Sequence, residues 1–177
     1  MKFNKTKIND LYIIEPEPRI DERGHLMRTF CEEEFKKNSI VFKIVQTNLT
    51  LTKIKNTVRG MHFQTSPMAE DKIVQCLRGA IYDVAIDLRS NSLTYGQWVA
   101  VELNENNKKM FLIPKGMAHG FQTTADNCEV QYFMSEFYSA DHASGVRWDD
   151  PYFNIKWPLA DPMLSDKDKA WPLIKST

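Results

Sequence analysis

With 177 residues, the chain is long enough for one domain with a substantial core and short for two, so we expect residues 1–177 to form a single domain. Its 23 basic and 23 acidic residues balance, which argues against nucleic acid or a membrane as a partner and leaves any binding charge local. The three cysteines lack paired spacing, and neither an apolar leader after Met1 nor a run of roughly 18 apolar residues occurs, so we expect a reducing, cytoplasmic location.

Apolar residues recur mainly with a period of two, which is typical of half-buried β-strands. The predicted strands are residues 44–51, 73–77, 80–88, 97–103, 109–113 and 129–137, and two further short, glycine-marked strand patterns lie in residues 58–64 and 113–122. Turn signals such as Arg78-Gly79 and Asp126-Asn127 separate them at roughly the 8- to 12-residue rhythm of a sandwich or barrel. Only residues 31–37 and 165–170 look helical, and a Pro- and Trp-rich C-terminal tail is expected to pack on this all-β domain.

Two histidines in glycine-marked strand patterns carry the clearest chemical signal. Arg59 stands beside His62, and Lys115 stands near His119. An imidazole titrates near neutral pH, whereas Arg and Lys neutralise phosphate without titrating. The pattern therefore predicts a pocket that binds an anionic substrate and moves a proton. The alternative interpretation is a pair of hydrogen-bonded structural histidines.

Two tyrosines and a lysine extend the set of candidates. Tyr132 and Tyr138 share a face if their strand stays extended, so each is either a phenolic proton donor or a core aromatic whose hydroxyl is satisfied locally. Lys72 begins an apolar strand and is either a solvated lysine or a buried functional one. Gln46 and Asn48 share a strand face and can order a ligand or satisfy backbone groups.

Two aspartates also have competing interpretations. Asp83 lies inside a strongly apolar strand and needs a partner if it is buried. Asp168 follows Ser165 by three residues, so a capping box at the last helix explains it as well as a catalytic role does. A metal site lacks ligands, because no second histidine or carboxylate follows His62 at a suitable spacing.

Together with Arg59-Gly60-Met61-His62-Phe63-Gln64, the segments that carry a resemblance are residues 21–24, 46–48, 72–74, 79–89, 95–98, 113–121, 132, 138–139, 148–151 and 164–168. Through their order and spacing, nearly the whole chain resembles the nucleotide-sugar 3,5-epimerase family. This resemblance implies a cupin-type double-stranded β-helix, a jelly-roll barrel with short peripheral helices. It also implies a homodimer with strand exchange near the N-terminus, no metal and no cofactor.

The resemblance further implies a division of roles. His62 is the expected base, oriented by Asp168 with Asp83 as the alternative, while Tyr132 is the expected acid and Lys72 meets the C4 oxygen of the substrate. The residues expected to hold a nucleotide-diphosphate sugar are Arg23, Arg28, Gln46, Asn48, Arg59, His119 and Tyr138.

The expected reaction is epimerisation at C3, C5 or both of a nucleotide-linked 4-keto-deoxy sugar. Protons at these carbons flank the C4 ketone, so removal of either gives an enolate whose charge develops on O4. A dTDP carrier is the default, with GDP, CDP or a heptose sugar open. The alternatives are a 3,4-ketoisomerase of a nucleotide sugar and a metal-binding cupin.

Two positions depart from the usual pattern of the family. Arg28 replaces an acidic residue, and Ala143-Ser144-Gly145 stands where Glu-Arg-Gly is usual. A guanidinium only donates hydrogen bonds whereas a carboxylate only accepts them. The exchange at Arg28 therefore predicts an altered nucleotide preference, while the expected catalytic set is untouched.

Overall fold

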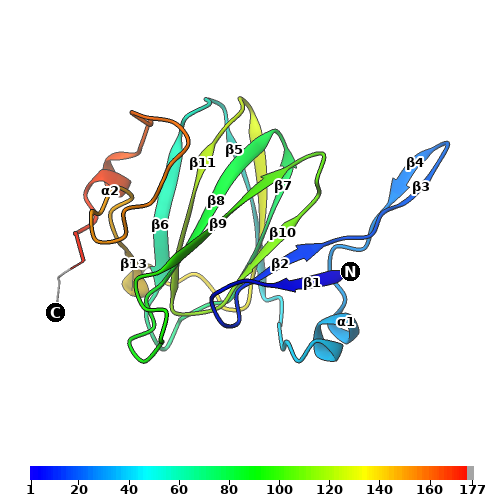
Figure 1. Ribbon diagram of the computed structural model, residues 1–177, viewed down its shortest axis with the longest axis horizontal. Coiled ribbons are helices and arrows are strands. Elements are labelled where there is room, and N and C mark those ends of the chain that lie inside the picture. Colours follow the sequence, from blue (N-terminus) through cyan, green and yellow to red (C-terminus); the bar gives the residue numbers. More distant parts are fainter. Residues whose placement is uncertain (175–177) are drawn as a thin grey trace.

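The computed structural model describes residues 1–174, which form two antiparallel sheets that face each other (Figure 1). The larger sheet has the order β1 (Lys2–Lys5), β2 (Tyr12–Glu15), β10 (Met110–Ile113), β7 (Lys72–Arg78), β12 (Cys128–Met134) and β5 (Gln46–Thr52). The smaller has the order β13 (Ala143–Gly145), β6 (Val58–Gln64), β11 (Met117–Thr123), β8 (Ala80–Asp87) and β9 (Trp98–Asn104). The predicted all-β jelly-roll fold class is confirmed.

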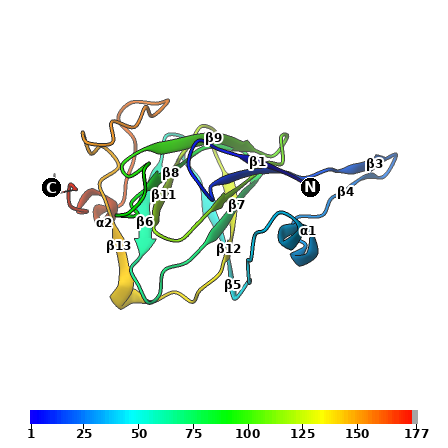
Figure 2. The ribbon, with the colours of Figure 1, turned by 60° about the horizontal axis from the view of Figure 1, so that its bottom comes forward.

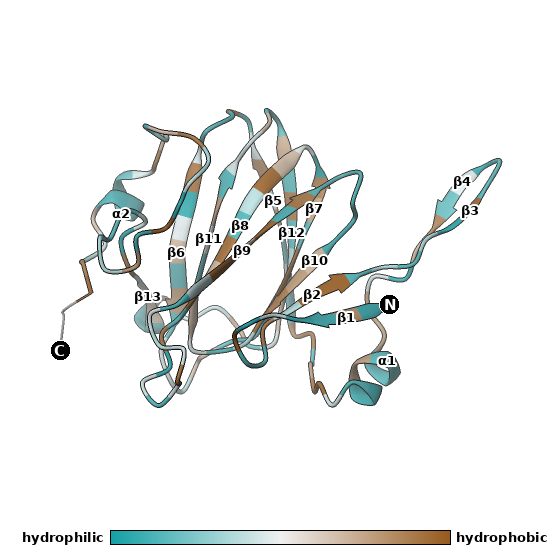
Figure 3. Ribbon diagram, in the orientation of Figure 1, coloured by the Kyte–Doolittle hydropathy of each residue, from teal (hydrophilic) through white to brown (hydrophobic). Residues whose placement is uncertain are grey.

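The core explains why β8 is apolar on both faces. Its Ile81 and Ala85 point between the sheets and pack with Phe111 and Phe121, whereas Val84 and Ile86 pack beneath the C-terminal tail. A third cluster, around Phe35, covers the outer face of the larger sheet. Figure 3 shows hydrophilic and hydrophobic segments following one another along the strands, as expected when only alternate side chains enter one apolar layer.

The predicted C-terminal packing is confirmed by its contacts. Trp98 Nε1 donates a hydrogen bond to the carbonyl oxygen of Phe153 at 2.9 Å, and Gln122 Nε2 donates to that of Leu159 at 2.8 Å. The tail contains the short helix α2 (Asp166–Lys169), which lies beside β6 in Figures 1 and 2.

The predicted strand 129–137 ends early. β12 stops at Met134 because Gln64 of the opposite sheet holds the following loop, bonding the carbonyl oxygen of Phe137 at 3.1 Å and the amide of Ser139 at 2.6 Å. The expected shared strand face of Tyr132 and Tyr138 is therefore wrong. The next turn is the 3₁₀ helix η1 (Ala140–His142).

The N-terminal arm contains the elements that sequence periodicity missed. The hairpin of β3 (Arg19–Asp21) and β4 (Gly24–Leu26) projects away from the sheets in both ribbon views (Figures 1 and 2), and Ile20 is 79% exposed. The predicted helix is present as α1 (Glu32–Lys37). None of the helices within residues 1–174 has the length and apolar character of a membrane span.

Candidate active site

A close approach of two glycines sets His62 and His119 side by side. A Cβ added to Gly60, whose φ is 141°, would lie 2.5 Å from Gly120 Cα, so both positions exclude a side chain. The two histidines are cross-strand partners of β6 and β11. Directly opposed residues of antiparallel strands share a face. The two imidazoles therefore lie on the same face of the smaller sheet.

His62 is held by the short helix α2. Its Nε2 lies 2.6 Å from Asp168 Oδ1, and the backbone amide of Gly60 donates to Asp168 Oδ2 at 3.4 Å. Burial alone would raise the pKa of the Asp168 carboxyl, but the hydrogen bond and charge of His62 hold that pKa below its usual value. An ionised carboxylate only accepts, so His62 Nε2 carries the proton and Nδ1 keeps its lone pair when the ring is neutral.

Asp168 supports both interpretations given above, the helix cap and the contact with the base, through different atoms. Its backbone amide donates to Ser165 Oγ at 3.1 Å, which caps α2. Its carboxylate is thereby free to contact His62. Capping thus fixes where the carboxylate lies.

Asp83 belongs to a second pair. Its Oδ1 lies 2.6 Å from His119 Nε2, and both side chains are buried, so the alternative in which Asp83 orients His62 is wrong. Burial raises the pKa of Asp83, against the opposing effect of His119. The ring of His119 packs edge-on against Tyr132, with centroids 6.1 Å apart.

Tyr132 faces the histidines from the larger sheet. It is the cross-strand partner of Asn48 in β5 and is only partly exposed. Burial raises the pKa of its phenol well above the ordinary value, although a hydrogen bond with Thr50 acts in the opposite direction. The phenol therefore keeps its proton near neutral pH and can act as a donor.

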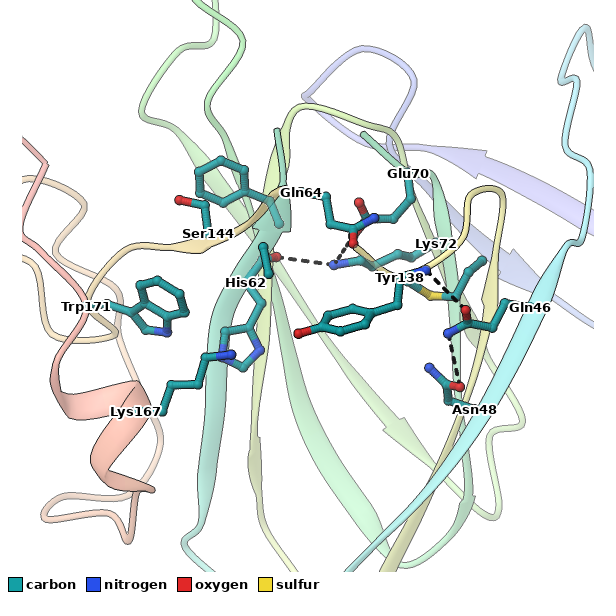
Figure 4. A pocket seen from close by; sticks show the side chains of 13 residues that line it. Gln46, Asn48, His62, Gln64, Glu70, Lys72, Tyr138, Ser144, Lys167 and Trp171 are labelled. Carbon is teal, nitrogen blue, oxygen red and sulfur yellow. Dashed lines mark hydrogen bonds and ion pairs between the residues drawn. The ribbon is translucent and has the colours of Figure 1, made fainter. Parts of the chain in front are cut away.

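Lys72 is buried at the start of β7, so the solvated-lysine interpretation is wrong. Only 8% of the residue is exposed. Its Nζ contacts Glu70 Oε1 at 2.8 Å and donates to the carbonyl oxygen of His62 at 3.2 Å, as Figure 4 shows. An ammonium group has three donors, so one remains for a ligand.

These side chains line one cavity between the sheets. Its larger part is about 350 Å³ and is lined by Asn48, Thr50, Arg59, His62, Lys72, His119, Phe121, Tyr132, Met134, Ser165, Lys167 and Asp168. A smaller part of about 190 Å³ shares several of these residues and adds Gln46, Gln64, Glu70, Tyr138, Ser144 and Trp171, all of which Figure 4 labels. Gln46 also accepts a hydrogen bond from the amide of Tyr138 at 3.2 Å, so it both satisfies backbone and faces the cavity.

Three basic residues that the sequence pointed to lie outside this cavity. Arg23 pairs with Asp21 on the projecting hairpin at 2.6 Å, and Arg28 pairs with Glu34 at 2.6 Å. Lys115 lines a different surface hollow. The altered nucleotide preference expected from Arg28 stays a prediction.

Sequence reasoning missed several residues that line the cavity, among them Lys167, Trp171 and Glu70. Lys167 resembled a solvated residue of a charged helix, Trp171 part of a packing tail, and Glu70 part of an exposed acidic pair. Only the position of Glu70 two residues before Lys72 gave a signal, because alternate strand residues share a face.

The cysteines and the candidate metal ligands of the described residues are distributed as follows. Residues 1–174 contain no cluster of three or more His, Cys, Asp or Glu side chains that could hold a metal ion. Cys31, Cys76 and Cys128 are free thiols. Burial raises the pKa of the Cys76 thiol to about 12, so Cys76 stays protonated near neutral pH.

Comparisons with known proteins match almost the whole chain. The dTDP-4-dehydrorhamnose 3,5-epimerase family matches residues 5–176. An enzyme of that name from Methanothermobacter thermautotrophicus is 43% identical over 98% of this chain and 95% of its own length. The Bacillus anthracis enzyme with TDP and PPi bound superposes with a TM-score of 0.96 at 40% identity, covering 98% of this chain and 99% of its own. The Legionella pneumophila enzyme in complex with dTDP-4-keto-L-rhamnose gives 0.92 at 37% identity, covering 97% and 92%.

Proposed function

Because the chain belongs to the dTDP-4-dehydrorhamnose 3,5-epimerase family, it is a carbohydrate epimerase acting on a dTDP-4-keto-6-deoxy sugar, and we propose that His62, Lys72 and Tyr132 divide the chemistry. One observation carries this proposal: a carboxylate-held imidazole on the smaller sheet faces a protonated phenol on the larger sheet, and a buried ammonium lies in the same cavity.

His62 removes the proton from C3 or C5. Its Nδ1 has the free lone pair, while Asp168 fixes the ring and stabilises the imidazolium that forms. The electron pair moves into the sugar and places negative charge on O4. The remaining donor of Lys72 stabilises that charge as it develops.

Tyr132 then donates its proton to the opposite face of the enolate. Inversion requires delivery from the side opposite the base, and Tyr132 stands on the sheet opposite His62. The phenolate left behind recovers a proton from solvent or from His62. Side chains and water suffice for every proton transfer in this cycle.

Arg59 lies where it can bind the diphosphate. It lines the cavity beside Ser165, and its Nε donates to Thr52 at 2.9 Å, so the guanidinium keeps other donors free for phosphate oxygens. His119 lines the same part of the cavity as Arg59, and we place the nucleotide toward Gln46, Asn48 and the exposed Tyr138, at the rim of the cavity.

Arg59 and Lys72 should affect different kinetic constants. Arg59→Ala should mainly raise KM for dTDP-4-keto-6-deoxyglucose, because it removes binding present in both ground and transition states. Lys72→Met keeps the aliphatic stem and should lower kcat by roughly 10²- to 10³-fold, as loss of one oxyanion donor does. Steady-state assays with NMR analysis of the product measure both effects.

The same assay tests the reaction itself. Wild-type enzyme should invert C3 and C5 while the carbonyl stays at C4. A product with its carbonyl at C3 would identify a ketoisomerase instead. An unchanged kcat in Lys72→Met, with unfolding temperature maintained, would remove Lys72 from the chemistry.

We also propose that the enzyme is a homodimer in which the hairpin of one protomer completes the cavity of the other. The hairpin of β3 and β4 projects away from the core of its own protomer. Its apolar side chains are therefore open to solvent: Ile20 is 79% exposed and Leu26 is 75% exposed. The edge strand β5 likewise exposes 62% of Leu49. Apolar side chains in such positions are typical of an interface. Arg23, at the hairpin tip, would then reach the nucleotide of the partner.

The dimer proposal predicts that Leu26→Asp dissociates the protein and raises KM, because a charge enters an apolar contact and Arg23 is withdrawn from the neighbouring cavity. Light scattering after size exclusion, followed by kinetics, measures both. Leu93→Asp is the matched control, because Leu93 is fully exposed in a loop away from the hairpin. A monomeric wild type at full activity would contradict the proposal.

A further inference from the structure

Glu70 is a buried carboxylate of which only one oxygen has a partner among the described residues. The residue is 6% exposed and lines the smaller part of the cavity. Its Oε1 contacts Lys72 Nζ at 2.8 Å, while its Oε2 has no hydrogen-bond partner within residues 1–174. A buried acceptor left unpaired is unfavourable, so such an atom in a ligand cavity indicates that a ligand group pairs with it.

Asp71 fixes the direction of the Glu70 side chain. The backbone amide of Lys115 donates to Asp71 Oδ1 at 2.9 Å, and the hydroxyl of Ser135 donates to Asp71 Oδ2 at 3.1 Å. These bonds hold Asp71, directly before β7, away from the cavity. Glu70 and Lys72 on either side of it both line the cavity, and Figure 4 shows them beside each other.

We infer that Glu70 is a specificity-determining residue whose free Oε2 accepts a hydrogen bond from the C3 hydroxyl of the sugar. The inference rests on the proposed role of Lys72 at O4. The C3 hydroxyl is the hydroxyl next to that carbonyl, and oxygens on neighbouring ring carbons lie about as close as hydrogen-bonded atoms. A substrate whose O4 meets Lys72 therefore brings its C3 hydroxyl to the carboxylate bound to the same ammonium.

The geometry accounts for both oxygens of Glu70. One oxygen orients Lys72 toward O4, and the other recognises the carbon at which the first proton can be removed. A carboxylate only accepts hydrogen bonds, so it selects a hydroxyl and rejects a C3 substituent that cannot donate. A site built to bind a hydroxyl discriminates strongly against analogues that lack it.

The experiment compares two substrates with two enzymes. Exchange of the C5 proton with D₂O is measured by NMR for dTDP-4-keto-6-deoxyglucose and for its 3-deoxy analogue, because both retain that proton. Glu70→Gln preserves shape and an oxygen for Lys72, but it places an amide donor where the second acceptor was. Glu129→Gln is the matched control, since Glu129 pairs with Arg78 at 3.3 Å outside the cavity.

In wild type and in Glu129→Gln, loss of the C3 hydroxyl should lower kcat/KM for C5 exchange by roughly 10-fold or more, as expected for a hydrogen bond to a charged group. In Glu70→Gln this ratio between the substrates should shrink by roughly 10-fold. Equal ratios in Glu70→Gln and wild type would overturn the inference, because Glu70 would then act only through Lys72.

Two further measurements keep the result decisive. If wild type exchanges C5 of both substrates with equal kcat/KM, the inference fails without any variant, whatever the folding of Glu70→Gln. Lys72→Met tests the proposed function separately, since it should lose exchange on both substrates. Suppose that Glu70→Gln leaves the ratio of kcat/KM between the two substrates unchanged, while Lys72→Met loses C5 exchange. This combination would count against the role of Glu70 alone.

Discussion

His62→Ala should abolish both product formation and exchange of the C3 and C5 protons of the substrate with D₂O. If the imidazole is the base, neither enolate forms without it, and a general base of this kind contributes roughly 10²- to 10⁴-fold. The variant should still bind dTDP, because Arg59 and Asn48 do not depend on the imidazole for their positions. NMR in D₂O, with titration calorimetry for dTDP, measures the two properties separately.

His142→Ala serves as the control for this experiment, because it removes an imidazole that does not line the cavity. It should keep both exchange and epimerisation. Persistent exchange in a folded His62→Ala protein would identify another base. His119 would then be the strongest candidate, as the buried imidazole on the same sheet face.

The sequence predicts the strands of the barrel better than it predicts their partners. Period-two alternation locates β7, β8 and β12 because each carries several apolar residues in phase. It misses β1 and the hairpin, because strands of three or four residues with a single large apolar side chain contain too few alternations. Those strands form through pairing with β2 and with each other, which periodicity does not record.

The candidate site shows the same division. His62 and His119 stand out because their glycines mark a close approach of strands, which a motif can record. The choice between Asp168 and Asp83 lies beyond a motif, since it depends on how α2 packs against β6 more than a hundred residues earlier. Glu70 is similar, because burial turns an apparently solvated acid into one with an unsatisfied oxygen.

Burial also separates two residues of the same type. Tyr132 and Tyr138 looked equivalent on an extended strand, but Gln64 pulls the chain away after Met134. Tyr138 is then 62% exposed at the mouth of the cavity, whereas Tyr132 stays inside with a raised pKa. The position of Tyr132 inside the cavity, beside His119 and on the sheet opposite His62, makes it the tyrosine placed to deliver a proton to a bound sugar.

Tyr132→Phe should separate proton removal from inversion. The substitution deletes the phenolic proton but keeps the ring that packs against His119 and the core. The enolate should still form through His62 and should be reprotonated by the same imidazole. We therefore expect deuterium to enter C3 and C5 with the original configuration, while inverted product falls by roughly 10²- to 10⁴-fold.

Tyr82→Phe is the matched control for this substitution, because Tyr82 packs against Trp157 on the outer face of the smaller sheet. It should epimerise like wild type. Its unfolding temperature shows how much stability is lost when a phenolic hydroxyl is removed outside the cavity. If Tyr132 were only a core aromatic, Tyr132→Phe would behave in the same way as this control. Near-normal inversion in Tyr132→Phe would therefore defeat its role as the acid, whereas loss of exchange as well as inversion would place the phenol in proton removal, together with His62.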